Sequence, residues 1–115
     1  MILVIGGRSQ GKTQYVMQNF GVREEEIACA FGKNKVIVHL EKLIRDQGAE
    51  RVLKSLEERA DTDCIVCCDE VGMGVVPADA GERAYRDEVG RVLCHAAQRA
   101  SRVIRVFAGL GQVIR

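Results

Sequence analysis

The feature of this 115-residue chain that most constrains its fold is a glycine-rich segment that directly follows its first apolar run. The run covers residues 1–5, and the segment reads Gly6-Gly7-Arg8-Ser9-Gln10-Gly11-Lys12-Thr13. A short continuous apolar run is typical of a strand that is buried on both faces of a parallel sheet. The segment has the pattern G-x-x-x-x-G-K-[ST], the Walker A loop that connects such a strand to a helix and wraps around phosphate groups.

Each part of this phosphate loop, residues 6–13, has a physical role in binding phosphate. Glycines let the backbone approach phosphate oxygens closely, and the N-terminus of the following helix directs N–H groups and a positive dipole end at the anion. We expect residues 6–13 to bind ATP or GTP, with Lys12 reaching the outer phosphates and the Thr13 hydroxyl helping to hold Mg²⁺. Arg8 either contacts phosphate or is solvated. The alternative for the whole segment is a glycine-rich turn with a chance Lys-Thr pair.

Strand-like and helix-like patterns alternate along the rest of the chain. Apolar or β-branched runs predict further strands at 26–31, 36–40, 64–68 and 103–107, the last of which closes the chain. Amphipathic stretches predict helices at 11–20, 41–60 (with a break near Gly48) and 80–100. Such alternation indicates one α/β domain with a mostly parallel sheet and helices on both faces. Ligands bind beyond the carboxyl ends of such strands, so the loops after Ile5 and Cys68 are where we expect a site.

The second of those loops begins with two carboxylates, because the apolar run 64–68 is followed by Asp69-Glu70. An apolar strand that ends in an acidic residue is the Walker B arrangement, in which a carboxylate completes the Mg²⁺ site. We therefore expect Asp69 and Glu70 to hold the metal with Thr13. One of the two carboxylates would position the hydroxyl that attacks the phosphate, with Lys12 as the third catalytic residue. The alternative is a polar strand end or a helix cap.

The residues after Glu70 supply candidate substrate contacts. Gly72 and Gly74 lie in the segment 71–77, which ends in proline and is typical of a shaped loop over a ligand. Arg83 and Arg86 have i, i+3 spacing and share one helix face. They would contact anionic groups of a ligand, pair with nearby carboxylates, or be solvated.

Composition limits the classes of partner. The formal net charge is +1 and aromatic residues make up 4% of the chain, which argues against nucleic-acid binding. No apolar run reaches the length of about 18 residues that spans a membrane, and the apolar start is too short for a signal peptide, so we expect a cytoplasmic location. The five cysteines are an odd number. Cys64 and Cys67 would point to opposite faces of a strand, which argues against a metal-binding pair.

The segment Glu70-Val-Gly-Met-Gly-Val-Val-Pro77, followed by Arg83-Ala-Tyr-Arg-Asp87 and Gly90, resembles the signature region of the adenosylcobinamide kinase / adenosylcobinamide-phosphate guanylyltransferase family. The phosphate loop and the tail 103–115 also resemble that family, so the likeness covers residues 1–20 and 64–115. The resemblance implies a RecA-like P-loop fold, a role in cobalamin biosynthesis and oligomers of the chain. It also implies two activities. ATP or GTP phosphorylates the hydroxyl of adenosylcobinamide, and GMP passes from GTP to that phosphate through a guanylylated histidine.

The histidines of this chain depart from that family pattern. Relatives carry the nucleophilic histidine between the first helix and the middle strands, but residues 14–35 contain no histidine. His39 stands where the family has an aspartate, and it is either a site residue or a polar residue at the end of a strand. His95 falls on the last predicted helix, as a surface or interface residue. We therefore expect an adenosylcobinamide kinase without guanylyltransferase activity; the alternatives are a non-catalytic or regulatory nucleotide-binding protein, or a kinase of another small hydroxylated substrate.

Overall fold

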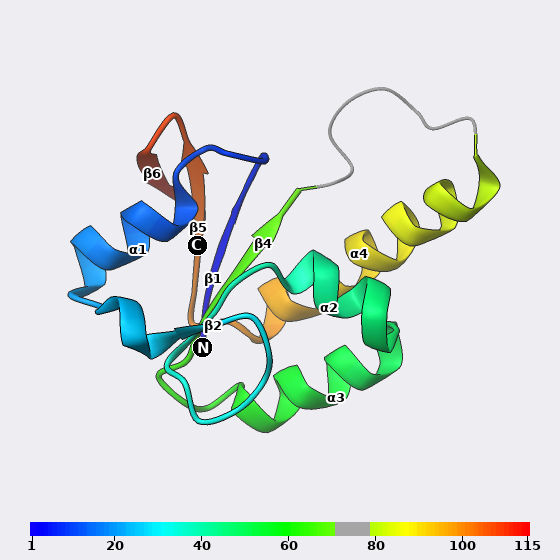
Figure 1. Ribbon diagram of the computed structural model, residues 1–115, viewed down its shortest axis with the longest axis horizontal. Helices are drawn as coiled ribbons and strands as arrows, with labels where there is room; N and C mark the ends of the chain where they lie inside the picture. Colours follow the sequence, from blue (N-terminus) through cyan, green and yellow to red (C-terminus); the bar gives the residue numbers. More distant parts are fainter. Residues whose placement is uncertain (71–78) are drawn as a thin grey trace.

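A six-stranded sheet forms the centre of the computed structural model, which describes residues 1–70 and 79–115 (Figure 1). The strand order is β2-β3-β4-β1-β5-β6, and every neighbouring pair is parallel except β5 and β6. The strands are β1 (Ile2–Gly6), β2 (Ile27–Ala28), β3 (Val36–Ile37), β4 (Ile65–Asp69), β5 (Arg102–Phe107) and β6 (Leu110–Val113). The predicted α/β fold with a mostly parallel sheet is confirmed.

Helices cover both faces of the sheet, as Figure 1 shows. They are α1 (Lys12–Phe20), α2 (Leu40–Gln47), α3 (Ala49–Arg59) and α4 (Ala80–Arg99), with a short 3₁₀ helix η1 (Glu24–Glu26). One apolar core lies between the sheet and α1, and a second lies between the sheet and the other three helices. The predicted break at Gly48 is confirmed, because this glycine separates α2 from α3 with φ at 88°.

Strand β4 contributes to both cores in alternation. Ile65 and Cys67 pack in the core beneath α1, whereas Val66 and Cys68 pack in the core beneath α2, α3 and α4. This two-sided burial is the reason why the strand reads as a continuous apolar run. Cys64 belongs to the second core and Cys67 to the first, so the prediction that they face opposite sides is confirmed. Burial raises the pKa of the Cys67 thiol to about 12.

Two predicted strands are much shorter than expected. The run 26–31 forms only β2, and the run 36–40 forms only β3. The second ends early because His39 takes a left-handed conformation, with φ at 58°, and Leu40 then begins α2. The apolar residues Val38 and Leu40 are buried, but Val38 lies in the loop before α2 and Leu40 lies in α2, so burial without strand pairing accounts for their strand-like pattern.

Residues 103–107 form a strand as predicted, within β5, but the prediction that it is the last strand is wrong. The chain reverses at Ala108 and Gly109, whose φ angles are 51° and 77°, and β6 returns antiparallel to β5. Positive φ at both central residues is the geometry of the tight turn that suits hairpin twist. Strand β6 forms one edge of the sheet, and four large apolar side chains in or beside this hairpin are exposed, namely Phe107, Leu110, Val113 and Ile114.

Among the described residues, no helix combines the length and the apolar character that crossing a lipid bilayer requires.

Candidate functional site

The two loops that the sequence singles out meet at one edge of the sheet. Strands β1 and β4 are parallel neighbours, and their register sets Gly6 opposite Asp69. The Nζ atom of Lys12 lies 2.6 Å from Oδ1 of Asp69, and it also donates to the carbonyl oxygens of Gly6 and Gly7 at 3.3 Å and 2.9 Å. Lys12 is 9% exposed, so its charge is held inside the site.

The phosphate loop leaves the start of α1 available to an anion. Gly11 precedes the helix with φ at 87°, and Ser9 is also left-handed, with φ at 60°. Within the described chain, no side chain caps this helix and no acidic residue lies in its first turn. The N–H groups of a helix N-terminus and its positive dipole end attract phosphate, so an uncapped start is what phosphate binding needs.

Gly6 is required by packing rather than by a special backbone angle. A Cβ atom at this position would lie 2.4 Å from the carbonyl oxygen of Val106 in the neighbouring strand β5. The same glycine accepts a hydrogen bond from the backbone N–H of Glu70 at 2.9 Å. The loop therefore begins at a point where three strands are in close contact, which fixes the position of its first residues.

The turn between β5 and β6 supports the other end of the phosphate loop. The backbone N–H of Gly109 donates to the carbonyl oxygen of Gln10 at 2.8 Å, and the N–H of Ala108 donates to Oε1 of Gln10 at 2.8 Å. A Cβ atom on Gly11 would lie 3.3 Å from Cα of Gly109. Strand β6, which the sequence analysis missed, thus helps to set the shape of the loop.

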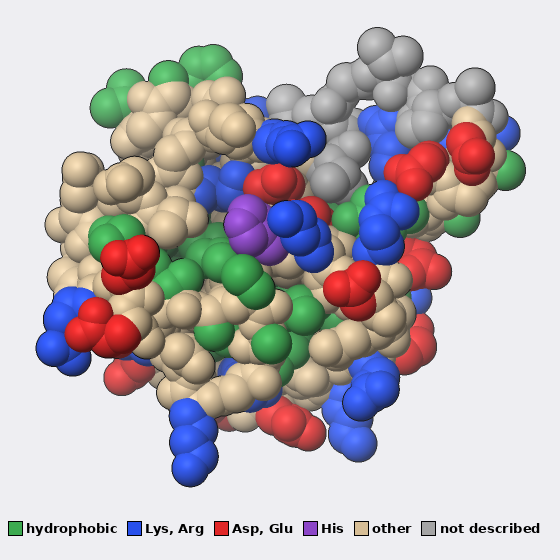
Figure 2. Space-filling view, viewed as in Figure 1, with side chains coloured by type: hydrophobic (Ala, Val, Ile, Leu, Met, Phe, Trp, Pro, Cys, Tyr) green, Lys and Arg blue, Asp and Glu red, His purple; other side chains and the backbone are tan. Residues whose placement is uncertain are grey.

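A cavity of about 890 Å³ opens beside the loop. It is lined by the phosphate loop, the end of β4, the start of α2, the first turns of α4 and the end of β5. On the face shown in Figure 2, basic and acidic side chains gather around a histidine. The volume falls in the range of small-molecule pockets, about 300–1,000 Å³.

Most of the predicted site residues line this cavity, namely Gly7, Arg8, Ser9, Gln10, Gly11, Lys12, Thr13, Asp69, Glu70 and Arg86. Gly6 lies behind them at the end of β1. Arg83 is exposed and is not among the lining residues, although it lies on the same helix as Arg86. Gly72 and Gly74, with the rest of the predicted loop over the ligand, lie outside the described residues.

The two adjacent carboxylates of the predicted Walker B pair have different neighbours. Asp69 pairs with Lys12, whereas Oε2 of Glu70 lies 3.4 Å from Nε of Arg105 on β5. Both carboxylates border the cavity and are partly buried, with side chains 18% and 20% exposed. Asp69 is therefore the carboxylate that lies directly against the phosphate loop.

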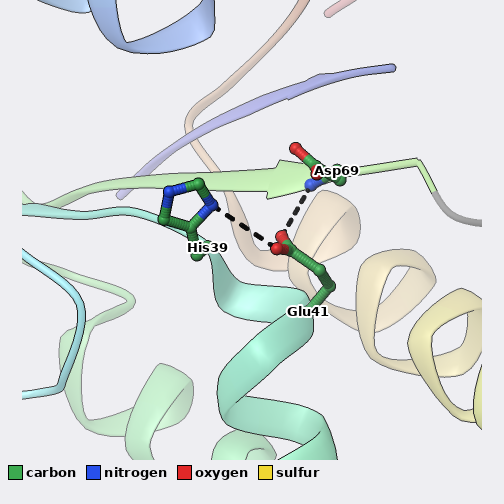
Figure 3. Close-up of side chains that lie close together, drawn as sticks. All are labelled: His39, Glu41 and Asp69. Atoms are coloured by element: carbon green, nitrogen blue, oxygen red, sulfur yellow. Dashed lines mark hydrogen bonds and ion pairs between the residues drawn. The ribbon is translucent and has the colours of Figure 1, made fainter. Parts of the chain in front are cut away.

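The sequence analysis missed Glu41, a buried acid at the start of α2. Its side chain accepts a hydrogen bond at Oε1 from the backbone N–H of Asp69 at 3.0 Å, and only 5% of the residue is exposed. Its Oε2 atom lies 3.5 Å from Nδ1 of His39, and Figure 3 shows the Glu41 carboxylate between the His39 ring and the backbone N–H of Asp69. The signal in the sequence is an acid just beyond a short apolar run, which has the same pattern as the charged positions of an amphipathic helix.

Contacts between α2 and α4 bring Arg86 to the cavity. The hydroxyl of Tyr85 donates to the carbonyl oxygen of Glu41 at 2.7 Å, and burial raises the pKa of that hydroxyl. Arg45 stacks over the Tyr85 ring at 3.8 Å and pairs with Glu82 at 2.9 Å. These contacts fix the first turns of α4 beside the start of α2, where the cavity is lined by both helices.

His95 lies outside this site. Its Nε2 atom is 2.9 Å from Oε1 of Glu57, and the pair joins the partly exposed surfaces of α4 and α3. The two histidines therefore differ in position, because His39 lines the cavity and His95 does not.

Comparison with known proteins supports the likeness seen in the motifs. A family model described as cobinamide kinase / cobinamide phosphate guanyltransferase matches residues 34–114, well over half of the chain. The match includes residues 34–63, where the motifs showed little resemblance, and it begins after the phosphate loop. No individual curated protein matches the chain. The sheet order and the position of the loop between β1 and α1 agree with a RecA-like P-loop fold. The chain is a member of the cobinamide kinase / cobinamide phosphate guanyltransferase family.

Proposed function

We propose that this chain binds ATP or GTP in the cavity beside the phosphate loop and transfers the terminal phosphoryl group to the hydroxyl of adenosylcobinamide. The observation that carries the proposal is the position of Lys12, which the loop holds between its own carbonyl oxygens and Asp69. A buried ammonium at the edge of a cavity, next to an uncapped helix start, is suited to phosphate oxygens. The family gives the corrinoid as the expected acceptor.

In the proposed reaction, the residues around the cavity have different roles. Lys12 and the N–H groups at the start of α1 would bind the phosphates and neutralise the charge that develops on the transferring group. Asp69 or Glu70 would orient the acceptor hydroxyl and accept its proton. Arg86 would contact an anionic part of either ligand, because it lies across the cavity on α4.

The residues present fit the Mg²⁺ ion that accompanies nucleotides at such loops. Magnesium prefers oxygen ligands, and the Thr13 hydroxyl and the Asp69 carboxylate both line the cavity, with Glu70 adjacent. When bound there, the ion would neutralise phosphate charge. These residues hold it, and Lys12 supplies positive charge to the phosphates in addition.

We propose that the second family activity, guanylyl transfer, is absent. That reaction needs a histidine nucleophile, and the segment 14–35 contains none. His39 lines the cavity, but its Nδ1 atom is directed at Glu41, and it sits on the far side of β4 from the phosphate-loop strand in the sheet order. Incubation with labelled GTP should therefore leave no GMP attached to the protein, and a stable adduct would contradict this part of the proposal.

A direct assay tests the kinase activity. The purified chain is incubated with adenosylcobinamide, Mg²⁺ and ATP or GTP, and the corrinoid is analysed by mass spectrometry. The expected product gains one phosphate with wild type and with the exposed-lysine control Lys54→Ala, but not with Lys12→Ala. No phosphorylated corrinoid, despite binding of both ligands, would instead favour a non-catalytic nucleotide-binding protein. Nucleotide hydrolysis stimulated by another hydroxylated compound would favour a kinase of a different substrate.

We also propose that copies of this chain associate. A small sheet buries a limited fraction of its surface, and the exposed apolar side chains Phe107, Leu110 and Val113 lie on the edge hairpin. Sedimentation of wild type should give a mass above that of one chain, and Leu110→Glu should lower it. If wild type and Leu110→Glu both sediment with the mass of one chain, the proposal is contradicted.

A further inference from the structure

Three potential metal ligands meet at the side of the cavity formed by α2 and β4. One ligand atom from each of His39, Glu41 and Asp69 can be chosen so that all three lie within 4.8 Å of one another. Figure 3 shows the three residues close together, with His39 just before α2, Glu41 in the first turn of α2 and Asp69 at the end of β4. Two ligands on opposite sides of one ion are about 4.2 Å apart when each bond is about 2.1 Å long. Small side-chain rotations would therefore complete the set.

Glu41 is the member that makes this more than a group of surface charges. Its carboxylate is buried, and the backbone N–H of Asp69 fixes its Oε1 atom at 3.0 Å. A hydrogen bond of this kind orients a carboxylate for coordination. Among the described residues, Glu41 pairs with His39, whose Nδ1 atom lies 3.5 Å from Oε2 of Glu41. Two carboxylates held this close, one of them buried, favour a cation between them.

We propose that His39, Glu41 and Asp69 form a binding site for a divalent first-row transition metal ion, for which Mn²⁺ is the probe, that the chain takes up without nucleotide. An imidazole nitrogen with two carboxylates suits such ions, whereas Mg²⁺ prefers a set of oxygen ligands. The site is distinct from the Mg²⁺ position at Thr13, because two of its three ligands come from the turn before α2 and from α2 itself. It does not depend on the kinase activity.

Asp69 links this site to the phosphate loop. One oxygen of its carboxylate pairs with Lys12 at 2.6 Å, and the same carboxylate would bind the ion. The Lys12 ammonium and the metal ion are both cations, so they compete for the negative charge of Asp69. Removing the lysine charge should therefore strengthen metal binding, an effect that a chance surface site elsewhere would not show.

The test is a titration of the metal-stripped chain with Mn²⁺ in the absence of nucleotide, with free ion followed by electron paramagnetic resonance. Wild type should bind one equivalent. His39→Asn, which removes the imidazole but tolerates the left-handed backbone, should weaken binding at least about tenfold. Glu41→Gln, which keeps an acceptor for the Asp69 N–H, should weaken it similarly. His95→Asn is the matched control and should bind as wild type does.

Further arms separate this proposal from the proposed function. Lys12→Ala should raise the affinity for Mn²⁺ while weakening nucleotide binding at least about tenfold, so the outcomes for the two sites are distinguishable. Excess Mg²⁺ should displace Mn²⁺ poorly from wild type and readily from His39→Asp, in which all ligands are oxygens. Absence of a stoichiometric Mn²⁺ site in folded wild type, or equal affinity in wild type and His39→Asn, would overturn the proposal.

Discussion

The Nζ atom of Lys12 lies 2.6 Å from Oδ1 of Asp69, although the two residues are far apart in the sequence. The contact exists because β1 and β4 are parallel neighbours whose carboxyl ends meet at one edge. Both side chains are largely buried, so solvent screens the pair weakly. The pair joins the phosphate loop to the acid-terminated strand β4.

Replacing Asp69 by asparagine should remove catalysis without unfolding the chain. The backbone N–H at this position still donates to Glu41, but the carboxylate that pairs with Lys12 is lost. We expect phosphoryl transfer at least about 100-fold slower, with a lower melting temperature because the buried Lys12 ammonium loses its partner, but with the circular dichroism spectrum of a folded chain. Turnover equal to that of wild type would show that Asp69 is not the catalytic or metal-binding carboxylate.

Replacing Gly6 by alanine should destabilise the chain, because the new Cβ would lie 2.4 Å from the carbonyl oxygen of Val106. Overpacking against backbone costs about 1–3 kcal/mol, which urea unfolding would measure. Gly90→Ala is the matched control, since no atom of the described residues lies within 4 Å of a Cβ at this helical position. It should raise the free energy of unfolding by about 0.5–1 kcal/mol. Equal stability of the two variants would contradict the packing described for β1 and β5.

Thiol labelling should separate the five cysteines into two groups. Cys29 and Cys94 are exposed, whereas Cys64, Cys67 and Cys68 are buried. Desolvation raises the pKa of all three buried thiols, and the thiolate is the reactive form. Iodoacetamide at pH 8 should modify only the exposed pair in the folded chain and all five cysteines in denaturant. Rapid modification of Cys67 in the folded chain would contradict the buried position of β4 in the sheet.

The pairing of α3 with α4 should weaken in acid. A hydrogen bond from His95, with added charge from Arg99, lowers the pKa of Glu57 below its ordinary value of 4.5. A lowered pKa in the folded state means that the stabilisation is present above about pH 4.5 and is lost as the pH falls through the lower value. Wild type should therefore melt at a higher temperature than Glu57→Gln at pH 7. The two should converge in acid, and a difference that grows in acid would contradict this ion pair.

Much of the fold and of the candidate site was predictable from the sequence, because their signals are local. The phosphate loop needs glycines and a lysine at fixed spacing, and buried parallel strands need continuous apolar runs. Residues 6–13, Asp69 and the break at Gly48 therefore lie as expected. The expected place of a site, in the loops after Ile5 and Cys68, follows from the rule that ligands bind at the carboxyl ends of parallel strands, and residues of both loops line the cavity.

The remaining features depend on contacts between distant segments. His39 ends β3 through a left-handed backbone, which is uncommon for residues other than glycine, so the apolar pattern predicted a longer strand. Glu41 gains its role from the N–H of Asp69, a partner in another element. Strand β6 is fully exposed, so it lacks the alternating burial by which strands are recognised. The support that Gln10 receives from Gly109 exists only because of that strand.

Titration of the chain with ATP and with GTP in the presence of Mg²⁺ tests the central claim most directly, with wild type compared to Lys12→Ala and Lys54→Ala. Lys54 is an exposed residue of α3 that does not line the cavity, so its variant controls for the loss of a positive charge. Calorimetry should show one nucleotide per chain for wild type and Lys54→Ala. Binding to Lys12→Ala should be at least about tenfold weaker, a loss of about 1.4 kcal/mol, with the circular dichroism spectrum unchanged. Equal nucleotide affinity in Lys12→Ala and wild type would contradict the assignment of this cavity as the nucleotide site.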